Sequence, residues 1–295
     1  MTIRPRRSVL YMPGSNARAL EKARTLAADG VILDLEDAVA PDAKAAAREQ
    51  VVTSVKAGGF GSREVFIRTN GFDTPWFADD LTAAAAAAPD AILIPKISSG
   101  EQLELIAQRL LSMHADRRVR IWAMIETPAA IFNVRQIAAA ARDAETRLTG
   151  FVMGTNDLAK ETRARAVPGR APMAAWLTTC VLAAREHGID ILDGVYNDIA
   201  NAEGFVAECT QARDFGFDGK TLIHPNQIAP CNAVFSPTTD EVVQARRMIA
   251  AFDLPENRDK GVVQIDGRMV ERMHAEMARR TVAIAEAIAA RGASS

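Results

Sequence analysis

The sequence contains little cysteine, and its cysteines form no recognisable pair. The three residues, Cys180, Cys209 and Cys231, are widely spaced and belong to no CxxC motif. An odd number at this spacing excludes a disulfide framework and a cysteine zinc site. It indicates reduced thiols, as in a cytoplasmic protein.

Neither charge nor hydropathy points to nucleic acid or to a membrane. The 35 Lys and Arg residues nearly balance the 37 Asp and Glu residues, so no bulk charge attracts an anionic partner. The longest apolar run, Ala83–Ala88, is far too short to span a bilayer. The basic start, MTIRPRRSVLYMPG, lacks the apolar core of a signal peptide. We therefore expect a cytoplasmic protein without nucleic-acid or membrane partners.

Several familiar catalytic motifs are also missing, namely HExxH, GxSxG and the P-loop. The glycine-rich segment 57–64, AGGFGSRE, precedes an expected strand and lacks the GxGxxG spacing. It is therefore typical of a helix-to-strand turn rather than of a phosphate cradle.

What the sequence does contain is a regular alternation of apolar strand-like and amphipathic helix-like segments. The expected strands are 7–12, 30–36, 64–69, 91–96, 120–126, 150–155, 190–195 and 219–224. The expected helices are 17–28, 41–56, 76–88, 100–113, 129–141, 172–187, 201–215 and 239–252. Such alternation predicts a parallel sheet, and eight repeats in about 250 residues favour an α/β fold of the (β/α)8 TIM-barrel type.

The chain continues beyond these repeats. Residues 253–268 are polar, and 271–291 form one more expected helix. We assign 1–252 to a TIM-barrel catalytic domain and 253–295 to a C-terminal helical extension. A barrel does not need this extension, so it either packs against another subunit or acts as a lid.

Polar residues gather where the expected strands end. The segment VILDLED runs from three apolar residues into Asp34, Glu36 and Asp37. Six further strands end in polar groups: Arg68 and Asn70, Lys96, Glu126, Asn156 and Asp157, Asp193 and Asp198, and His224. Each could be structural, as a helix N-cap or, for Asp34, as the partner of a core lysine. Together they predict a site, because chemistry in a parallel barrel lies at the carboxyl ends of its strands.

The residue types at these ends indicate a metal and an acidic substrate. Oxygen ligands without a His or Cys cluster favour Mg2+ or Mn2+ over zinc. Arg68 offers a planar donor fork that suits a carboxylate. A metal and an arginine together suit a 2-oxo acid and would stabilise an enolate.

The sequence resembles the HpcH/HpaI aldolase and citrate lyase β-subunit family, nearest its CoA-ester lyases for malyl-CoA, methylmalyl-CoA and citramalyl-CoA. The resemblance covers nearly the whole chain. It rests on eight segments in order: LYMPGS (10–15), LDLEDAVAPDAKAAAR (33–48), IRTNGFDTPW (67–76), ILIPKI (92–97), MIET (124–127), GTNDLAKE (154–161), LDGVYND (192–198) and GFDGKTLIHPNQI (216–228).

The resemblance implies roles for the residues at the strand ends. Glu126 and Asp157 would hold Mg2+, and both would contact substrate. Arg68 would bind the oxo-acid carboxylate. Glu36 and Asp37 would hold metal-bound waters or surround them, as part of the catalytic set.

Further residues would bind the rest of the substrate. Tyr11 and Lys22 fall where the family contacts the CoA nucleotide, Ile223 and His224 line the thioester end, and Asn156 joins the substrate site. The resemblance also implies a homotrimer or homohexamer, with the C-terminal segment capping the site of a neighbour.

Two departures from the family pattern concern Asn16 and Glu271. Asn16 stands where relatives often have an arginine after PGS, which puts one phosphate contact in doubt. Glu271, in GRMVERMH, stands where relatives have a lid aspartate that acts as acid or base. It is either that catalytic group or only a negative charge at the start of the last helix.

The main hypothesis is a Mg2+-dependent lyase that cleaves a 3-hydroxyacyl-CoA, such as malyl-CoA or citramalyl-CoA, reversibly into a 2-oxo acid and an acyl-CoA. A CoA thioesterase on the same scaffold is the first alternative. A citrate lyase β subunit, active only in a complex with an acyl-carrier protein, is the second. A metal aldolase for a hydroxy acid without CoA fits less well, because LYMPGS and the extended tail resemble the CoA branch.

Overall fold

Eight parallel strands close into a barrel, as the alternation predicts. The computed structural model describes residues 3–293. The strands follow one another around the barrel in sequence order, and β8 pairs with β1 to close it. They are β1 (Ser8–Pro13), β2 (Gly30–Asp34), β3 (Glu64–Arg68), β4 (Ala91–Ile94), β5 (Arg120–Ile125), β6 (Leu148–Met153), β7 (Asp190–Asp193) and β8 (Gly219–Leu222).

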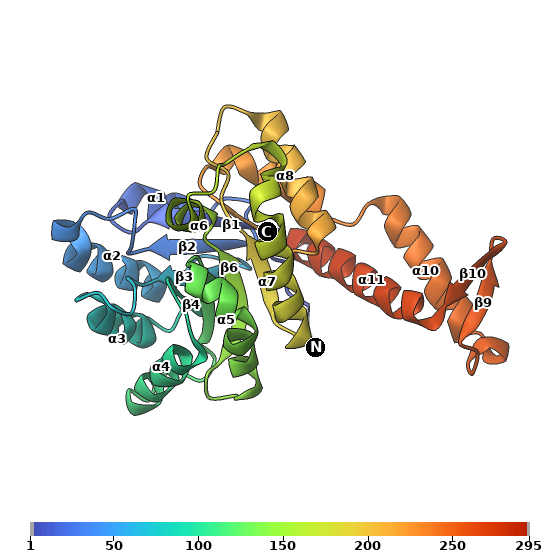
Figure 1. The fold of residues 1–295 in the computed structure, drawn as a ribbon, viewed down its shortest axis with the longest axis horizontal. Helices are drawn as coiled ribbons and strands as arrows, with labels where there is room; N and C mark the ends of the chain where they lie inside the picture. The colour runs from blue at the N-terminus through green and yellow to red at the C-terminus, as the bar shows by residue number, and fades with distance from the viewer. Residues whose placement is uncertain (1–2, 294–295) are drawn as a thin grey trace. The chain divides into compact units, whose positions relative to one another are not determined.

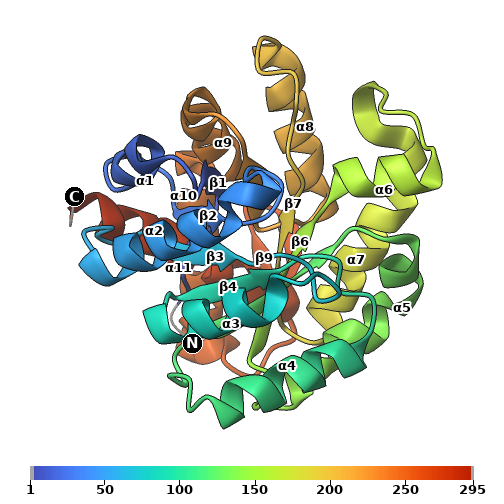
Figure 2. The ribbon, with the colours of Figure 1, turned by 90° about the vertical axis from the view of Figure 1, so that its left-hand side faces the viewer.

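Helices surround these strands (Figure 2). They are α1 (Ala17–Ala23), α2 (Lys44–Ala57), α3 (Phe77–Ala87), α4 (Gly100–Ser112), α5 (Pro128–Ala139), α6 (Thr155–Thr162), α7 (Ala174–Glu186), α8 (Ala202–Phe215) and α9 (Ile228–Phe235). Short 3-10 turns η1 (Pro41–Ala43), η2 (Ala140–Arg142), η3 (Pro168–Met173) and η4 (Pro225–Gln227) join them. The sequence did not predict α6, which directly follows β6, or α9, which follows β8 and the turn η4.

Two layers of side chains fill the barrel unit. One layer lies between the strands and the helices, and the other lies inside the barrel. Inside, Phe66 and Trp122 meet edge to face with ring centroids 5.3 Å apart. Arg6 lies over the Trp122 ring and pairs with Glu64 and Asp190, which close the end of the barrel where the strands begin. The interior is therefore packed, and open chemistry is left to the other end of the strands.

The compact unit of the barrel comprises Arg6–Phe235, and residues 3–5 and 236–293 form a second unit. The boundary between the two compact units thus lies after Phe235, whereas the sequence analysis placed the end of the barrel domain at residue 252. The second unit contains α10 (Thr239–Asp253), η5 (Pro255–Asn257) and α11 (Arg272–Ala293). The assignment of 253–295 as a lid or oligomerisation segment stays a prediction.

The second unit also contains a hairpin that the sequence analysis did not predict. Strands β9 (Val262–Ile265) and β10 (Arg268–Glu271) pair antiparallel, and α10 and α11 lie side by side next to them (Figure 1). The turn residues Asp266 and Gly267 both have positive φ, as a two-residue hairpin turn requires. The Asp-Gly pair was the available signal.

Candidate active site at the carboxyl ends of the strands

The buried carboxylate that ends β2 is an anchor for an arginine. Both oxygens of Asp34 accept hydrogen bonds from Arg68 of β3, from Nε and from Nη2, each at 2.7 Å. The Asp34 carboxylate also accepts hydrogen bonds from the backbone N–H groups of Glu36 and Ala38. Burial alone would raise the pKa of Asp34, but Arg68 outweighs it and holds the pKa below its usual value. Asp34 therefore stays charged and orients the guanidinium and the loop together.

The third guanidinium nitrogen of Arg68 faces the centre of the site. Its Nη1 lies 2.7 Å from Glu36 Oε2 and 3.5 Å from Asp37 Oδ2. The guanidinium carbon lies 4.8 Å from the centre of the Tyr11 ring, and Nη1 and the Tyr11 hydroxyl both contact Met124 Sδ at 3.9 Å. A substrate carboxylate at Nη1 would compete with Glu36 and Asp37, and Asp37 is 66% exposed.

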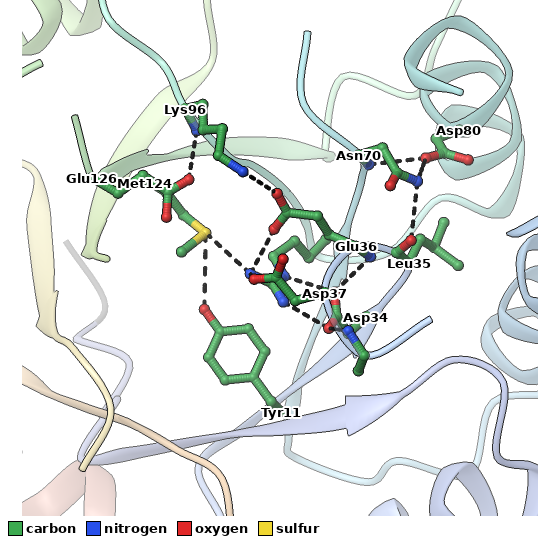
Figure 3. A network of polar contacts seen from close by, with 12 residues as sticks. Tyr11, Asp34, Leu35, Glu36, Asp37, Asn70, Asp80, Lys96, Met124 and Glu126 are labelled. Atoms are coloured by element: carbon green, nitrogen blue, oxygen red, sulfur yellow. Dashed lines mark hydrogen bonds and ion pairs between the residues drawn. The ribbon is translucent and has the colours of Figure 1, made fainter. Parts of the chain in front are cut away.

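Glu36 lies between two cations. Its Oε1 accepts a hydrogen bond from Lys96 Nζ at 3.0 Å (Figure 3). Its Oε2 faces Arg68 Nη1. Burial raises the pKa of Glu36, and Arg68 opposes this shift. The Lys44 ammonium donates to the carbonyl oxygens of Leu35 and Glu36, both at 2.8 Å, and so fixes the loop that presents Glu36.

Glu126 is as deeply buried as Asp34, with only 1% of the residue exposed. Its Oε1 accepts the backbone N–H of Lys96 at 2.8 Å. Burial, with the negative charges of Glu36 and Asp157, raises the pKa of Glu126 to about 8, although Arg68 opposes the shift. A buried carboxyl group among other carboxylates is the kind of group that a cation stabilises.

A glycine makes room for Glu126. A Cβ atom at Gly154, directly after β6, would lie 2.3 Å from both Glu126 Cβ and Glu126 Oε2. Only glycine therefore lets the end of β6 approach Glu126 so closely.

Asp157 completes the predicted metal pair. It lies in the first turn of α6, and its charge acts on both Glu126 and Lys96. Within residues 3–293 no group of three or more His, Cys, Asp and Glu side chains is arranged to hold a metal ion. Two carboxylates with oxygen donors alone nevertheless fit Mg2+, which commonly takes one or two carboxylates and fills its other positions with water or substrate.

Comparison with known proteins identifies the family. Residues 7–225 match the HpcH/HpaI aldolase/citrate lyase family. The chain belongs to this family. It is 52% identical to the (3S)-malyl-CoA thioesterase of Cereibacter sphaeroides strain KD131, over 97% of this chain and 96% of that protein. It is 33% identical to the L-malyl-CoA/beta-methylmalyl-CoA lyase of C. sphaeroides strain ATCC 17025, over 97% and 96% of the two chains.

A solved structure of this family has the same fold. CitE from Mycobacterium tuberculosis, in complex with magnesium, acetoacetate and coenzyme A, superposes with a TM-score of 0.76 at 29% identity. The match covers 96% of this chain and 98% of that chain. The TIM barrel and the family that the sequence indicated are thus confirmed.

The structure brings together most of the residues that the sequence analysis assigned to the centre. Glu36, Asp37, Arg68 and Glu126 belong to or border one network of polar contacts. Tyr11, which the sequence analysis assigned to the CoA nucleotide, lies beside Arg68 in the same network (Figure 3), and its contact with CoA stays a prediction.

Asn156 lies next to this centre in sequence and is exposed. It exchanges hydrogen bonds with Asn197, which links the first turn of α6 to the loop between β7 and α8. Its assignment to the substrate site stays a prediction.

Three residues predicted to bind CoA are Lys22, Ile223 and His224. Lys22 is exposed on the last turn of α1. His224 follows β8 and caps η4, because its Nδ1 accepts the backbone N–H of Asn226 at 3.2 Å. Ile223, beside it, is 36% exposed. Their contact with CoA stays a prediction.

Glu271 belongs to the second unit, where it ends β10 directly before α11. Its side chain is exposed, and its backbone N–H donates to His274 Nδ1 at 3.1 Å. Its role as an acid or base stays a prediction.

Two further polar strand ends, for which the sequence analysis left a structural role open, have structural contacts. Asp193 does not point into the barrel but outward, where Lys220 at 2.6 Å and Arg170 at 2.7 Å neutralise it. The inward position next to it is occupied by Leu192. Asn70 donates to Asp80 at 2.6 Å and to the Leu35 carbonyl at 3.0 Å, so it ties two loops together and caps no helix.

Proposed function

We propose that this protein is a Mg2+-dependent enzyme that hydrolyses the thioester of a 3-hydroxyacyl-CoA such as malyl-CoA. The observation that carries this proposal is the 52% identity to a (3S)-malyl-CoA thioesterase over 97% of the chain. The lyase reaction, which the sequence analysis favoured, is the second candidate, because a lyase of the same family is 33% identical over the same share. We favour hydrolysis because the chain is more similar to the thioesterase than to the lyase.

The described geometry supports binding of a small hydroxy acid. Glu126 and Asp157 would hold Mg2+, which would polarise substrate oxygens as a Lewis acid. Arg68 would take the substrate carboxylate at Nη1, because Asp34 holds Nε and Nη2 and so sets the plane of the guanidinium. Binding there moves Glu36 and the exposed Asp37 away from Arg68 Nη1.

The proton-transfer group of this proposal is Glu271. A carboxylate on a capping segment would activate water for hydrolysis or protonate an enolate after carbon–carbon cleavage. We propose that it acts on the site of a neighbouring subunit in a homotrimer or homohexamer. Tyr11, Lys22, Ile223 and His224 would contact the CoA part of the substrate.

The deciding experiment separates the two products. Purified full-length protein is incubated with malyl-CoA and Mg2+, and released thiol and 2-oxo acid are measured in parallel. Thiol and malate without oxo acid indicate hydrolysis. Oxo acid without thiol indicates the lyase and would overturn the thioesterase proposal. No activity on free CoA esters would favour a β subunit that needs an acyl-carrier partner.

The metal requirement has its own test. Glu126→Gln and Asp157→Asn should each lose Mg2+ binding in calorimetry and lose turnover while keeping the fold, because each removes a charged ligand. Glu104→Gln, on the exposed face of α4, is the matched control and should behave like wild type. Full activity in EDTA, or in either ligand variant, contradicts the metal site.

A further inference from the structure

One residue at the mouth of the site, Lys96, connects both halves of it. Its backbone N–H donates to Glu126 Oε1 at 2.8 Å, and its Nζ donates to Glu36 Oε1 at 3.0 Å. Glu126 belongs to the proposed metal pair, whereas Glu36 belongs to the Arg68 network. Sequence reasoning gave Lys96 no role beyond its place at a strand end.

The backbone of Lys96 is in an unusual conformation. Its φ is 57°, in the left-handed region that residues with a Cβ atom rarely adopt. Such strain persists only where surrounding contacts hold it, and it gathers at functional sites. Here the conformation accompanies the hydrogen bond from the backbone to Glu126.

The side chain of Lys96 is the more exposed of the two cations that contact Glu36. It is 44% exposed, whereas the side chain of Arg68 is only 7% exposed and is held by Asp34. A cation that is half in solvent can move away at little cost, while a buried and doubly bonded guanidinium cannot. The Lys96 ammonium contacts Glu36 and interacts electrostatically with Glu126 and Asp157, so it and an incoming Mg2+ would repel each other.

We propose that the Lys96 ammonium is the resident cation of this carboxylate cluster when no metal is bound, and that a divalent cation must displace it. The inference rests on the metal site of the proposed function. Lys96 is thus a residue that weakens metal binding, which sets it apart from the ligands. A residue that merely positions Glu126 would have the opposite effect when removed.

The test is calorimetric titration of the metal-free full-length protein with Mg2+, without substrate. Lys96→Met should bind Mg2+ about 3- to 30-fold more tightly than wild type, because one repulsive charge is gone. Lys96→Arg keeps the charge and should stay within about threefold of wild type. Lys96→Gly should follow Lys96→Met, because glycine accepts the left-handed backbone and keeps the donor to Glu126.

Two controls separate repulsion from structural change. Lys56→Met removes an exposed lysine of α2 and should leave Mg2+ affinity within about twofold of wild type, because distant surface charges are screened. Added NaCl should shrink the difference between wild type and Lys96→Met, since salt screens charge repulsion but does not repair a distorted ligand.

The outcomes distinguish this inference from the proposed function. If wild type binds Mg2+ and Lys96→Met binds it equally or more weakly, the displacement role is wrong while the metal site stands. If wild type binds no Mg2+ at all, the proposed metal requirement fails and this inference fails with it. A salt-dependent gain in Lys96→Met that is absent in Lys96→Arg supports displacement.

Discussion

Gly154→Ala tests the site through a single added methyl group. The new Cβ atom would lie 2.3 Å from Glu126 Cβ and 2.3 Å from Glu126 Oε2. Carbon atoms in contact lie about 3.5–4.0 Å apart, so the two Cβ atoms would have to separate by more than about 1 Å. A new rotamer of Glu126 cannot achieve this, because a Cβ atom moves only with its backbone. The ends of β5 and β6 must therefore shift.

The expected loss follows from that shift. Overpacking of this kind costs about 1–3 kcal/mol of unfolding free energy. A displacement of about 1 Å at a reacting group costs about 100-fold in rate. We therefore expect kcat/KM to fall by about 100-fold or more. Mg2+ affinity should fall by at least about tenfold, which is typical when a residue that orients a metal ligand is mutated.

The assay combines urea unfolding, Mg2+ calorimetry and turnover of malyl-CoA. Gly71→Ala is the matched control, since its Cβ would meet Thr74 and Lys96 only at 3.7 and 3.9 Å, which are ordinary contacts. Neither glycine has a positive φ, so both variants test space and not backbone strain. Wild-type Mg2+ affinity and turnover in Gly154→Ala would refute the placement of Glu126 in the metal site.

Three further experiments test the remaining parts of the reasoning. Arg68→Lys replaces a bidentate fork with a point charge and should cost about 2–4 kcal/mol of transition-state binding; a kcat/KM within about threefold of wild type would exclude Arg68 as the carboxylate clamp. Burial alone would raise the pKa of Asp193, but the Lys220 and Arg170 cations outweigh it and hold the pKa below its usual value. The ionised Asp193 therefore contributes its whole share of the unfolding free energy above about pH 4, and this contribution is lost as the pH falls through the lowered pKa. Asp193→Asn should lower unfolding free energy at pH 7 by about 3–5 kcal/mol and flatten that acid dependence; unchanged acid unfolding would contradict it. Glu271→Ala and Arg68→Ala, each inactive alone, should regain activity after unfolding, mixing and reassembly if Glu271 acts on a neighbouring subunit; normal turnover of Glu271→Ala alone would make it only a helix-terminal charge.

The sequence by itself was sufficient for the barrel and for the family. Short apolar strands alternate with amphipathic helices eight times, and this local pattern leaves few arrangements besides a closed parallel sheet. Polar groups at the strand ends were visible as well, because strand ends can be placed to within a few residues. The (β/α)8 barrel and the grouping of Glu36, Arg68 and Glu126 at one end follow from these patterns alone.

Only the tertiary structure decided which polar end faces inward and what each charge contacts. Asp34 and Asp193 both close apolar strands, yet one orients Arg68 inside the barrel while the other pairs with Lys220 outside it. Side chains alternate between the two faces of a strand, so one residue of register separates a site residue from a structural ion pair. The left-handed backbone of Lys96 has no signal in its own sequence, because contacts with Glu126 and Glu36 from other strands stabilise it.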